Sequence, residues 1–346
     1  MDNKFVDLRS DTVTKPTPAM RRAMSEAEVG DDVFEGDPTV RELERFTAEL
    51  LGKEAAIFVP SGTMANQVAI RCHTQPGDEM LIDANAHIYW YEGGGPAALS
   101  GVTCRVLQGK RGVFSKADIR NALRPTDVHF PPTRLLAVEN THNRGGGAIW
   151  PLEQIEEVCS IARDADMRTH LDGARIWNAS VATGIPESDY AKSFDTVSVC
   201  FSKGLGAPVG SALAGTTELV KNARRFRKML GGGMRQVGII AAGALYALAH
   251  HRERLADDHA NAKRLAMGLS KVPGIRVDGD EVETNMVYFD LERRSAAQMA
   301  EQLKAMGILV LQTGEHTIRA VTSLAVGTEG ITKAIDAVTE IVAAQP

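Results

Sequence analysis

Short apolar segments alternate with amphipathic segments along the chain up to about residue 250. The short segments are rich in branched apolar residues, as in buried strands, and the amphipathic segments repeat their apolar positions at helical spacing. We expect strands at 55–59, 79–82, 103–107, 134–139, 167–172, 195–199 and 211–214. We expect helices at 18–24, 39–51, 62–74, 93–100, 116–123 and 152–166. Strands this apolar, separated by helices, predict a mostly parallel sheet with helices on both faces.

The pattern changes towards the C-terminus. Long helices are expected at 231–248 and 250–269. Strands are then expected at 285–291, 308–311 and 317–321, with helices at 296–306 and 328–344. This order predicts a small α+β domain. We therefore expect two domains: residues 1–249 hold an extended N-terminal arm and a large domain, and residues 250–346 form the small C-terminal domain.

Composition narrows the class of protein. The 346 residues are 44% hydrophobic and 24% charged, which is ordinary for a soluble globular enzyme. A net charge of −5 gives no sign of a nucleic-acid partner. The chain has no apolar run long enough for a membrane helix, and its first residues lack the apolar core of a signal peptide. We expect a cytoplasmic protein that binds neither nucleic acid nor membrane.

The four cysteines and nine histidines do not have the spacing of a metal site. The cysteines are most simply buried thiols in a reducing compartment. We therefore expect no metal.

Lys203 ends an apolar strand and is followed at once by small residues, Gly204 and Gly206 among them. A lysine at the mouth of a buried strand is partly dehydrated, which disfavours the ammonium and makes the amine available as a nucleophile. The glycines leave room for a flat molecule near the backbone. The alternative is a lysine that merely ends a strand and points into water.

Asp172 ends the expected strand that precedes the Lys203 strand. A pyridoxal phosphate site needs this pair: a lysine that forms a Schiff base with the aldehyde, and an acid that keeps the pyridine nitrogen protonated. In parallel sheets, ligands bind beyond the carboxyl ends of the strands, where both residues lie. The alternatives for Asp172 are a salt bridge, or a cap for a helix that starts near Gly173.

The segment around Ser61, Gly62 and Thr63 leads from a strand into a helix. The free N–H groups of Gly62 and Thr63 make an anion cradle suited to a cofactor phosphate. The alternative is an ordinary capped helix with Ser61 as its N-cap.

Two histidines and two arginines complete the candidates. His87 could stack on the pyridine ring, although a lone histidine is more often a hydrogen-bonding loop residue; for His129 a functional role is weaker still. Arg175 and Arg319 could each grip an amino-acid carboxylate through two parallel hydrogen bonds, although most arginines form surface ion pairs.

Seven segments together closely resemble the threonine aldolase family, within the β-eliminating lyase group of pyridoxal enzymes: 7–14, 30–33, 60–66, 139–147, 170–175, 202–208 and 231–236. They span nearly the whole chain in the family's order. The resemblance implies the aspartate aminotransferase fold, an α/β fold whose large domain has a mostly parallel sheet covered by helices, with a smaller C-terminal α+β domain. It also implies pyridoxal 5′-phosphate as cofactor.

The resemblance further implies retro-aldol cleavage of L-threonine, L-allo-threonine and related β-hydroxy-α-amino acids to glycine and an aldehyde such as acetaldehyde. It implies a homo-oligomer, at least a dimer and most simply a homotetramer. The implied roles are as follows: Lys203 as Schiff-base lysine, Asp172 at the pyridine nitrogen, Ser61, Gly62 and Thr63 at the phosphate, His87 on the ring, Ser10, Arg175 and Arg319 at the substrate carboxylate, Arg175 also beside the cofactor, His129 near the substrate hydroxyl, and Lys228 and Arg235 at the phosphate region across a subunit interface. His87, His129 or a water is the candidate base.

The chain departs from the family pattern in two places. Phe34-Glu35-Gly36 replaces an aromatic residue followed by glycine and an acid, and Val321-Thr322-Ser323 replaces a common Val-Thr-His. Two rival functions stay open: another pyridoxal reaction on the same scaffold, such as transamination, β-elimination or racemisation, and a non-catalytic binding protein. Release of glycine and aldehyde, without pyruvate or ammonia, would separate aldol cleavage from the other reactions.

Overall fold

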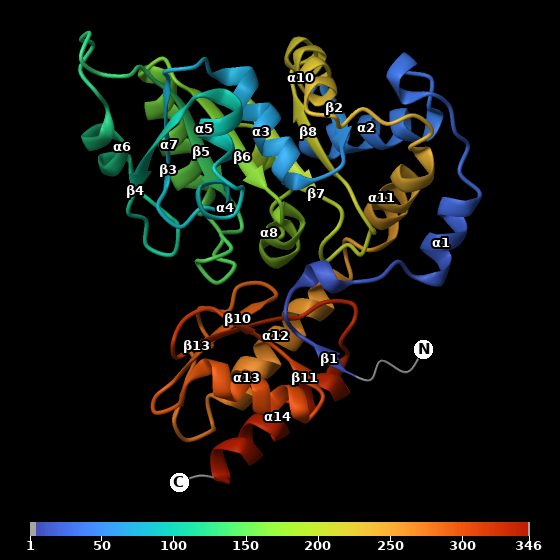
Figure 1. The fold of residues 1–346 in the computed structure, drawn as a ribbon, viewed down its shortest axis with the longest axis vertical. Helices are drawn as coiled ribbons and strands as arrows, with labels where there is room; N and C mark the ends of the chain where they lie inside the picture. The colour runs from blue at the N-terminus through green and yellow to red at the C-terminus, as the bar shows by residue number, and fades with distance from the viewer. Residues whose placement is uncertain (1–4, 345–346) are drawn as a thin grey trace.

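The computed structural model describes residues 5–344, which form a large lobe and a smaller lobe (Figure 1). The large lobe is built on a seven-stranded sheet, and the smaller one on a four-stranded sheet. None of the helices within residues 5–344 has both the length and the apolar character needed to cross a membrane.

The large sheet is mostly parallel, as its apolar strands predict. Its spatial order is β2 (Ala55–Val59), β8 (Ser211–Gly215), β7 (Thr196–Cys200), β6 (Arg168–Gly173), β5 (Thr133–Glu139), β3 (Glu79–Asp83) and β4 (Thr103–Leu107). Strand β8 is antiparallel to both of its neighbours, and the pairs from β7 across to β4 are parallel. The carboxyl ends of β6 and β7 therefore meet at one edge of the sheet, where ligands bind in such folds.

The helices of the large lobe form largely where the sequence predicts them: α1 (Pro18–Ser25), α2 (Pro38–Leu51), α3 (Gly62–His73), α5 (Gly95–Ser100), α6 (Lys116–Ala122) and α7 (Leu152–Asp164). Local signals set their ends. Asp37 caps the start of α2 by accepting from the Val40 amide, and Gly52 ends it with a φ of 60°, which favours glycine.

Four helices fall on segments to which the pattern assigned none: α4 (His87–Trp90), α8 (Ile176–Thr183), α9 (Glu187–Ala191) and α10 (Thr217–Met229). The expected helix at 231–248 is wrong at its start, because Gly231 has a φ of 78° and the chain turns there before α11 (Gly238–His250) begins. The next helix, α12 (Leu255–Leu269), likewise begins later than expected.

The smaller lobe carries an antiparallel sheet in the order β12 (Leu311–Gln312), β13 (Thr317–Val321), β10 (Met286–Leu291) and β9 (Ile275–Arg276). Its core also takes residues from α12, α13 (Ala296–Ala305) and α14 (Thr328–Ala343). The strand expected at 308–311 is divided: β11 (Ile308–Leu309) pairs outside this sheet, and β12 within it.

The N-terminal arm crosses to the smaller lobe, where β1 (Val6–Asp7) runs parallel to β11 (Figure 1). Leu8 is buried in the core of that lobe, and its backbone bonds Leu309 and Val321. The arm then turns through a short 3-10 helix, Asp11–Val13, capped by Ser10. Residues 6–8 are thus anchored in the smaller lobe, although they are far from it in sequence. The domain boundary near residue 250 stays a prediction.

We expect Leu8→Ala to loosen the arm, because deleting a fully buried leucine side chain costs about 2–5 kcal/mol. Thermal unfolding should show a clearly lower Tm, and limited proteolysis should cut the arm sooner. Leu99→Ala is the matched control, because Leu99 is 49% exposed on α5. Equal shifts in Tm for the two variants would contradict the anchoring role of Leu8.

Candidate active site

A cavity of about 540 Å³ contains Lys203, just past the carboxyl end of β7. Its walls come from the arm, the large lobe and the smaller lobe. The residues that line it are Ser10, Thr12, His87, Tyr91, Asn143, Arg144, Arg175, Lys203, Tyr288, Leu311, Thr313, Thr317 and Arg319. Five residues selected from the sequence, Ser10, His87, Arg175, Lys203 and Arg319, thus surround one space.

Asp172 is the next-to-last residue of β6 and a buried carboxylate. Its oxygens accept hydrogen bonds from Asn66 Nδ2 at 2.9 Å and from the Ala174 amide at 3.1 Å. Burial alone would raise the pKa of Asp172, but the positive charges of His87 and Lys203 and the bond from Asn66 hold that pKa below its ordinary value. Asp172 is therefore an ionised acceptor inside the protein.

His87 begins α4 and points its Nδ1 at Glu92 Oε1, 3.0 Å away. Burial lowers the pKa of His87, but the hydrogen bond to Glu92 and the charge of Asp172 outweigh it, so the pKa is raised overall. The Glu92 side chain is fully buried and also accepts from the amides of Asn66 at 2.8 Å and Gln67 at 2.6 Å. The ring of His87 is thereby fixed in orientation.

His87, Glu92 and Asp172 place three groups able to ligate a metal within 4.8 Å of one another. The amide N–H groups of Asn66 already donate to both carboxylates. Because both carboxylates already accept N–H donors, these three residues fit a charged N–H group, such as a protonated pyridine nitrogen, better than a metal ion.

The first turn of α3 carries the segment for which an anion cradle is expected, and that role stays a prediction. Ser61 Oγ accepts from the Met64 amide at 3.1 Å, so Ser61 is also the N-cap. The Gly62 and Thr63 amides, at the first two helical positions, have no carbonyl of the helix to bond. A Cβ atom at Gly62 would lie 2.7 Å from Cys200 Sγ, so only glycine fits there. This turn suits a phosphate group.

Lys228 and Arg235 flank a glycine-rich turn that packs on the same helix, since a side chain at Gly232 would strike Met64. Lys228 is exposed near the end of α10, and Arg235 Nη1 pairs with Asp31 at 3.0 Å. Their predicted reach to a neighbouring subunit's phosphate stays a prediction.

Arg175 is buried and forms a two-pronged ion pair with Asp11, through Nε at 2.8 Å and Nη2 at 2.7 Å. Asn285 of the smaller lobe adds a bond to Asp11 at 3.3 Å. Burial opposes the charge of Asp11, but Arg175 overcomes it and lowers the Asp11 pKa to about 2. Within the described residues Arg175 keeps one nitrogen, Nη1, without a hydrogen bond, and that nitrogen is available to a ligand.

Arg319 reaches the cavity from β13. Its Nη1 donates to Asn143 Oδ1 and its Nη2 to the Arg9 carbonyl, both at 3.0 Å. Its buried Nε has no partner among residues 5–344. The Tyr288 hydroxyl donates to the Asn143 backbone carbonyl at 3.2 Å. Asn143, which accepts from Arg319, is thus itself held in place.

His129 is not among the residues that line the Lys203 cavity. It lies on an exposed loop, with 80% of its side chain accessible, and its Nδ1 pairs with neighbouring Asp127. The described chain by itself does not bring His129 to Lys203, and its role near a substrate hydroxyl stays a prediction.

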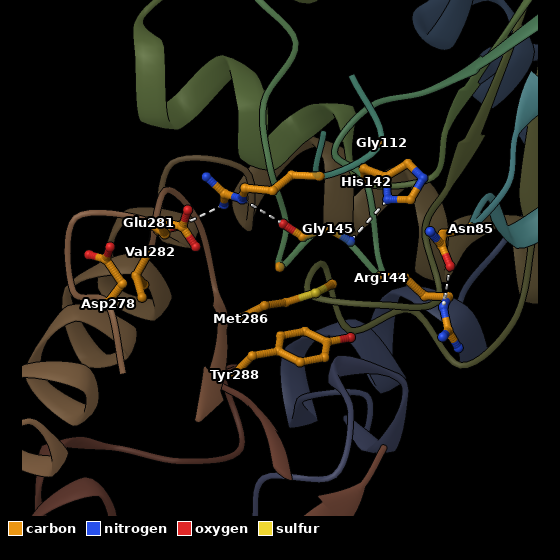
Figure 2. Close-up of a pocket in the computed structure, with 12 residues that line it drawn as sticks. Asn85, Gly112, His142, Arg144, Gly145, Asp278, Glu281, Val282, Met286 and Tyr288 are labelled. Atoms are coloured by element: carbon orange, nitrogen blue, oxygen red, sulfur yellow. Dashed lines mark hydrogen bonds between the residues drawn. The ribbon is translucent and has the colours of Figure 1, made fainter. Parts of the chain in front are cut away.

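A second cavity of about 340 Å³ shares Arg144 and Tyr288 with the first (Figure 2). Its two arginines already have hydrogen-bond partners. Arg111 donates to the carbonyls of Gly145 and Glu281, and Arg144 donates to Asn85. This cavity contains no nucleophile comparable to Lys203, so we place the chemistry in the first one.

Several polar residues of the site carried no role in the sequence analysis, chiefly Glu92, Asp11, Asn143, Tyr288 and Asn66. Asn66 stood in the 60–66 motif, four residues after Gly62 and so on the same face of the helix. That spacing was the available signal for Asn66. Glu92 and Asp11 meet their partners only through the fold.

Residues 7–292 match the beta-eliminating lyase family, and the chain belongs to that family. A relative from Arabidopsis thaliana named low-specificity L-threonine aldolase 1 is 45% identical over 325 residues, covering 92% of this chain and 91% of the relative. The low specificity L-threonine aldolase of Escherichia coli K12 is 42% identical, covering 94% of this chain and 96% of its own. The expected kinship with threonine aldolases, and with it a lyase, is confirmed.

Solved structures confirm the expected fold. A Leishmania major threonine aldolase superposes with a TM-score of 0.84 at 21% identity, covering 97% of this chain and 99% of that chain. A serine palmitoyltransferase from Sphingomonas wittichii gives 0.76 at 19% identity, covering 98% and 88%. At such identities the likeness speaks for the fold alone.

The Asp11–Arg175 pair predicts a defined acid sensitivity. Since the folded pKa of Asp11, about 2, lies below its ordinary 3.8, its charge contributes stability above about pH 4 that is lost as the pH falls towards 2. Asp11→Asn, which leaves Arg175 buried and unpaired, should cost about 3–5 kcal/mol at pH 7. Thermal unfolding should show that the difference in Tm between Asp11→Asn and the unmodified protein becomes smaller below pH 4.

Asp336→Asn is the control, because Asp336 is exposed on α14 and should leave the Tm unchanged at every pH. A gap for Asp11→Asn that stays constant from pH 7 to pH 3 would mean that the Asp11 charge is not what stabilises the fold.

Proposed function

We propose that this chain is a pyridoxal-phosphate-dependent aldolase. It cleaves L-threonine, L-allo-threonine and related β-hydroxy-α-amino acids to glycine and an aldehyde such as acetaldehyde. The observation that carries the proposal is that the Lys203 amine and the Arg319 guanidinium line one cavity, while the ionised Asp172 is buried close enough to Lys203 for their charges to interact. The naming of the relatives and the family match add their support.

The side chains present suit the cofactor. Lys203 is the amine for its aldehyde, Asp172 the acceptor for its pyridine nitrogen, and the amides of Gly62 and Thr63, with Ser61, the cradle for its phosphate. His87 supplies a flat, fixed ring for stacking. When bound, pyridoxal phosphate supplies an electron sink for the bond broken at Cα.

Arg319 and Arg175 determine which bond of the substrate breaks. Arg319, with Nη1 of Arg175 and the Ser10 hydroxyl, grips the substrate carboxylate. A carboxylate held in one place would fix the orientation of the bonds at Cα, the Cα–Cβ bond among them. Positioning by these residues would therefore favour aldol cleavage over rival reactions.

A base must take the proton of the β-hydroxyl while the aldehyde leaves. His87 Nδ1 faces Glu92, so its Nε2 is the atom free to accept that proton. Because its pKa is raised, a larger share of His87 is charged near neutral pH and the basic form grows as the pH rises. His129 and a water stay as alternatives.

The active unit is a homo-oligomer, at least a dimer and most simply a homotetramer, and it works in the cytoplasm. Support for assembly comes from exposed groups around the glycine-rich turn. Phe34 is 80% exposed and Met229 67%, beside the exposed cation of Lys228. In the proposed assembly Lys228 and Arg235 serve a neighbour's phosphate.

Turnover of the four threonine stereoisomers tests the function. The holoenzyme should release acetaldehyde and glycine in equal amounts from an L isomer, and Lys203→Ala should release neither. Borohydride reduction before peptide mapping should fix the cofactor to Lys203. Release of 2-oxobutanoate with ammonia would instead indicate elimination, and release of 2-oxo-3-hydroxybutanoate without ammonia would indicate transamination. A label on another lysine would overturn the site.

We expect Arg319→Leu to reduce kcat/KM for threonine by about 10- to 100-fold, because a charge-assisted bidentate contact is worth about 1.5–3 kcal/mol. Steady-state kinetics with aldehyde detection measures this. Arg264→Leu, at an exposed position of α12, is the matched control and should be neutral. Unchanged efficiency in Arg319→Leu would place the carboxylate site elsewhere.

A further inference from the structure

A seam of polar side chains runs through the otherwise apolar contact between α3 and the large sheet. On the sheet side, the strand register sets His170 of β6 opposite Thr196 of β7, and Asp172 opposite Ser198. Residues two apart on a strand share a face, so these four side chains form two layers. All four are at least 97% buried.

The helix side of the seam comes from Asn66 and His73, two turns apart on one face of α3. Asn66 lies in the layer of Asp172, bonding it at 2.9 Å. His73 lies in the layer of Thr196, with Nε2 at 2.9 Å from the hydroxyl oxygen. The helix thus contributes one residue to each layer.

The orientation of Asn66 is fixed by its neighbours. Its Nδ2 lies between Asp172 Oδ2 at 2.9 Å and Glu92 Oε1 at 2.8 Å, and ionised carboxylates can only accept. The NH₂ group therefore faces them, and Oδ1 faces Ser198 Oγ at 2.7 Å and His170 Nε2 at 3.0 Å. It follows that His170 Nε2 carries a proton and donates to Asn66.

The same logic continues along the seam. His170 is neutral, since burial lowers its pKa to about 3, so its Nδ1 accepts from the Thr196 hydroxyl at 2.9 Å. The Thr196 oxygen in turn accepts from His73 Nε2, whose pKa burial lowers to about 4. Every donor from His73 onwards points towards Asp172.

We propose that Asn66, His170 and Thr196 are positioning residues, which, with His73, form a one-directional hydrogen-bond chain that orients Asp172 and stabilises its negative charge. This rests on the proposed role of Asp172 at the pyridine nitrogen. Aligned donors strengthen one another in a dry interior, so the chain presents a positive end to the carboxylate. An ionised Asp172 keeps the pyridine nitrogen protonated, and the electron sink at full strength.

The hydrogen-bond chain runs along the strands, from the amino end of β7 towards the carboxyl end of β6. Asp172 is near the carboxyl end of β6, whereas Thr196 is the first residue of β7. His73 borders a separate cavity of about 480 Å³, together with Arg168 and Asp195. The orientation and the negative charge of Asp172 therefore depend, in this proposal, on side chains that are remote from Lys203.

Thr196→Val and Thr196→Ser form the test pair. Valine keeps the branched shape but removes the hydroxyl, and serine keeps the hydroxyl. With ¹⁵N-labelled pyridoxal phosphate bound, the pyridine nitrogen signal of Thr196→Val should move towards the unprotonated position. Its kcat should fall by about tenfold, as is usual when a group that supports a functional side chain is removed, with KM within about twofold. Serine should restore both.

Two further measurements keep the outcomes distinct. In histidine-labelled protein without cofactor, ¹⁵N spectra should show His170 as the Nε2–H form, assigned with His170→Gln. Thr339→Val, at an exposed position of α14, should change nothing. A His170 protonated at Nδ1, or a pyridine signal unmoved in Thr196→Val, overturns the chain. Failure to cleave threonine would instead contradict the proposed function. The signals of the pyridine nitrogen and of the His170 ring nitrogens could still be measured in that case.

Discussion

A carboxylate that stays charged inside the protein is the constraint on which the site depends. Burying an isolated charge is costly, and Asp172 keeps its charge only because hydrogen-bond donors and cations surround it. The Asn66 amide that serves Asp172 also serves Glu92, and Glu92 in turn orients His87. One buried charge therefore determines what α3, α4 and two strands must supply around it.

The sequence predicts the large sheet well, because most of its strands are short apolar runs that alternate with helices. It predicts α10 and the break between β11 and β12 poorly. Six of the thirteen residues of α10 are charged, and one of the three that it buries is Arg227, so an apolar face is hard to recognise in the sequence. The break at Val310 separates two strands that pair with different partners, and partners are a property of the tertiary fold.

The candidate site divides in the same way. Lys203, Asp172 and Gly62 lie at strand or helix ends, where a linear pattern carries the chemistry. Asp11 becomes functional only through a partner far away in sequence, Arg175, and Glu92 is buried against Asn66 and Gln67 of α3. His129 is the opposite case. The family resemblance gives it a role near the substrate hydroxyl, but in the single chain it is exposed on a loop.

The N-terminal arm has a consequence for what counts as a domain. The smaller lobe includes β1 and buries Leu8, so its core is made from both ends of the chain. A recombinant fragment that starts at residue 250 would leave Ile308 without its parallel neighbour and an open apolar slot where Leu8 belongs. The core of this lobe is complete only after α14 has been synthesised, although β1 is made long before it.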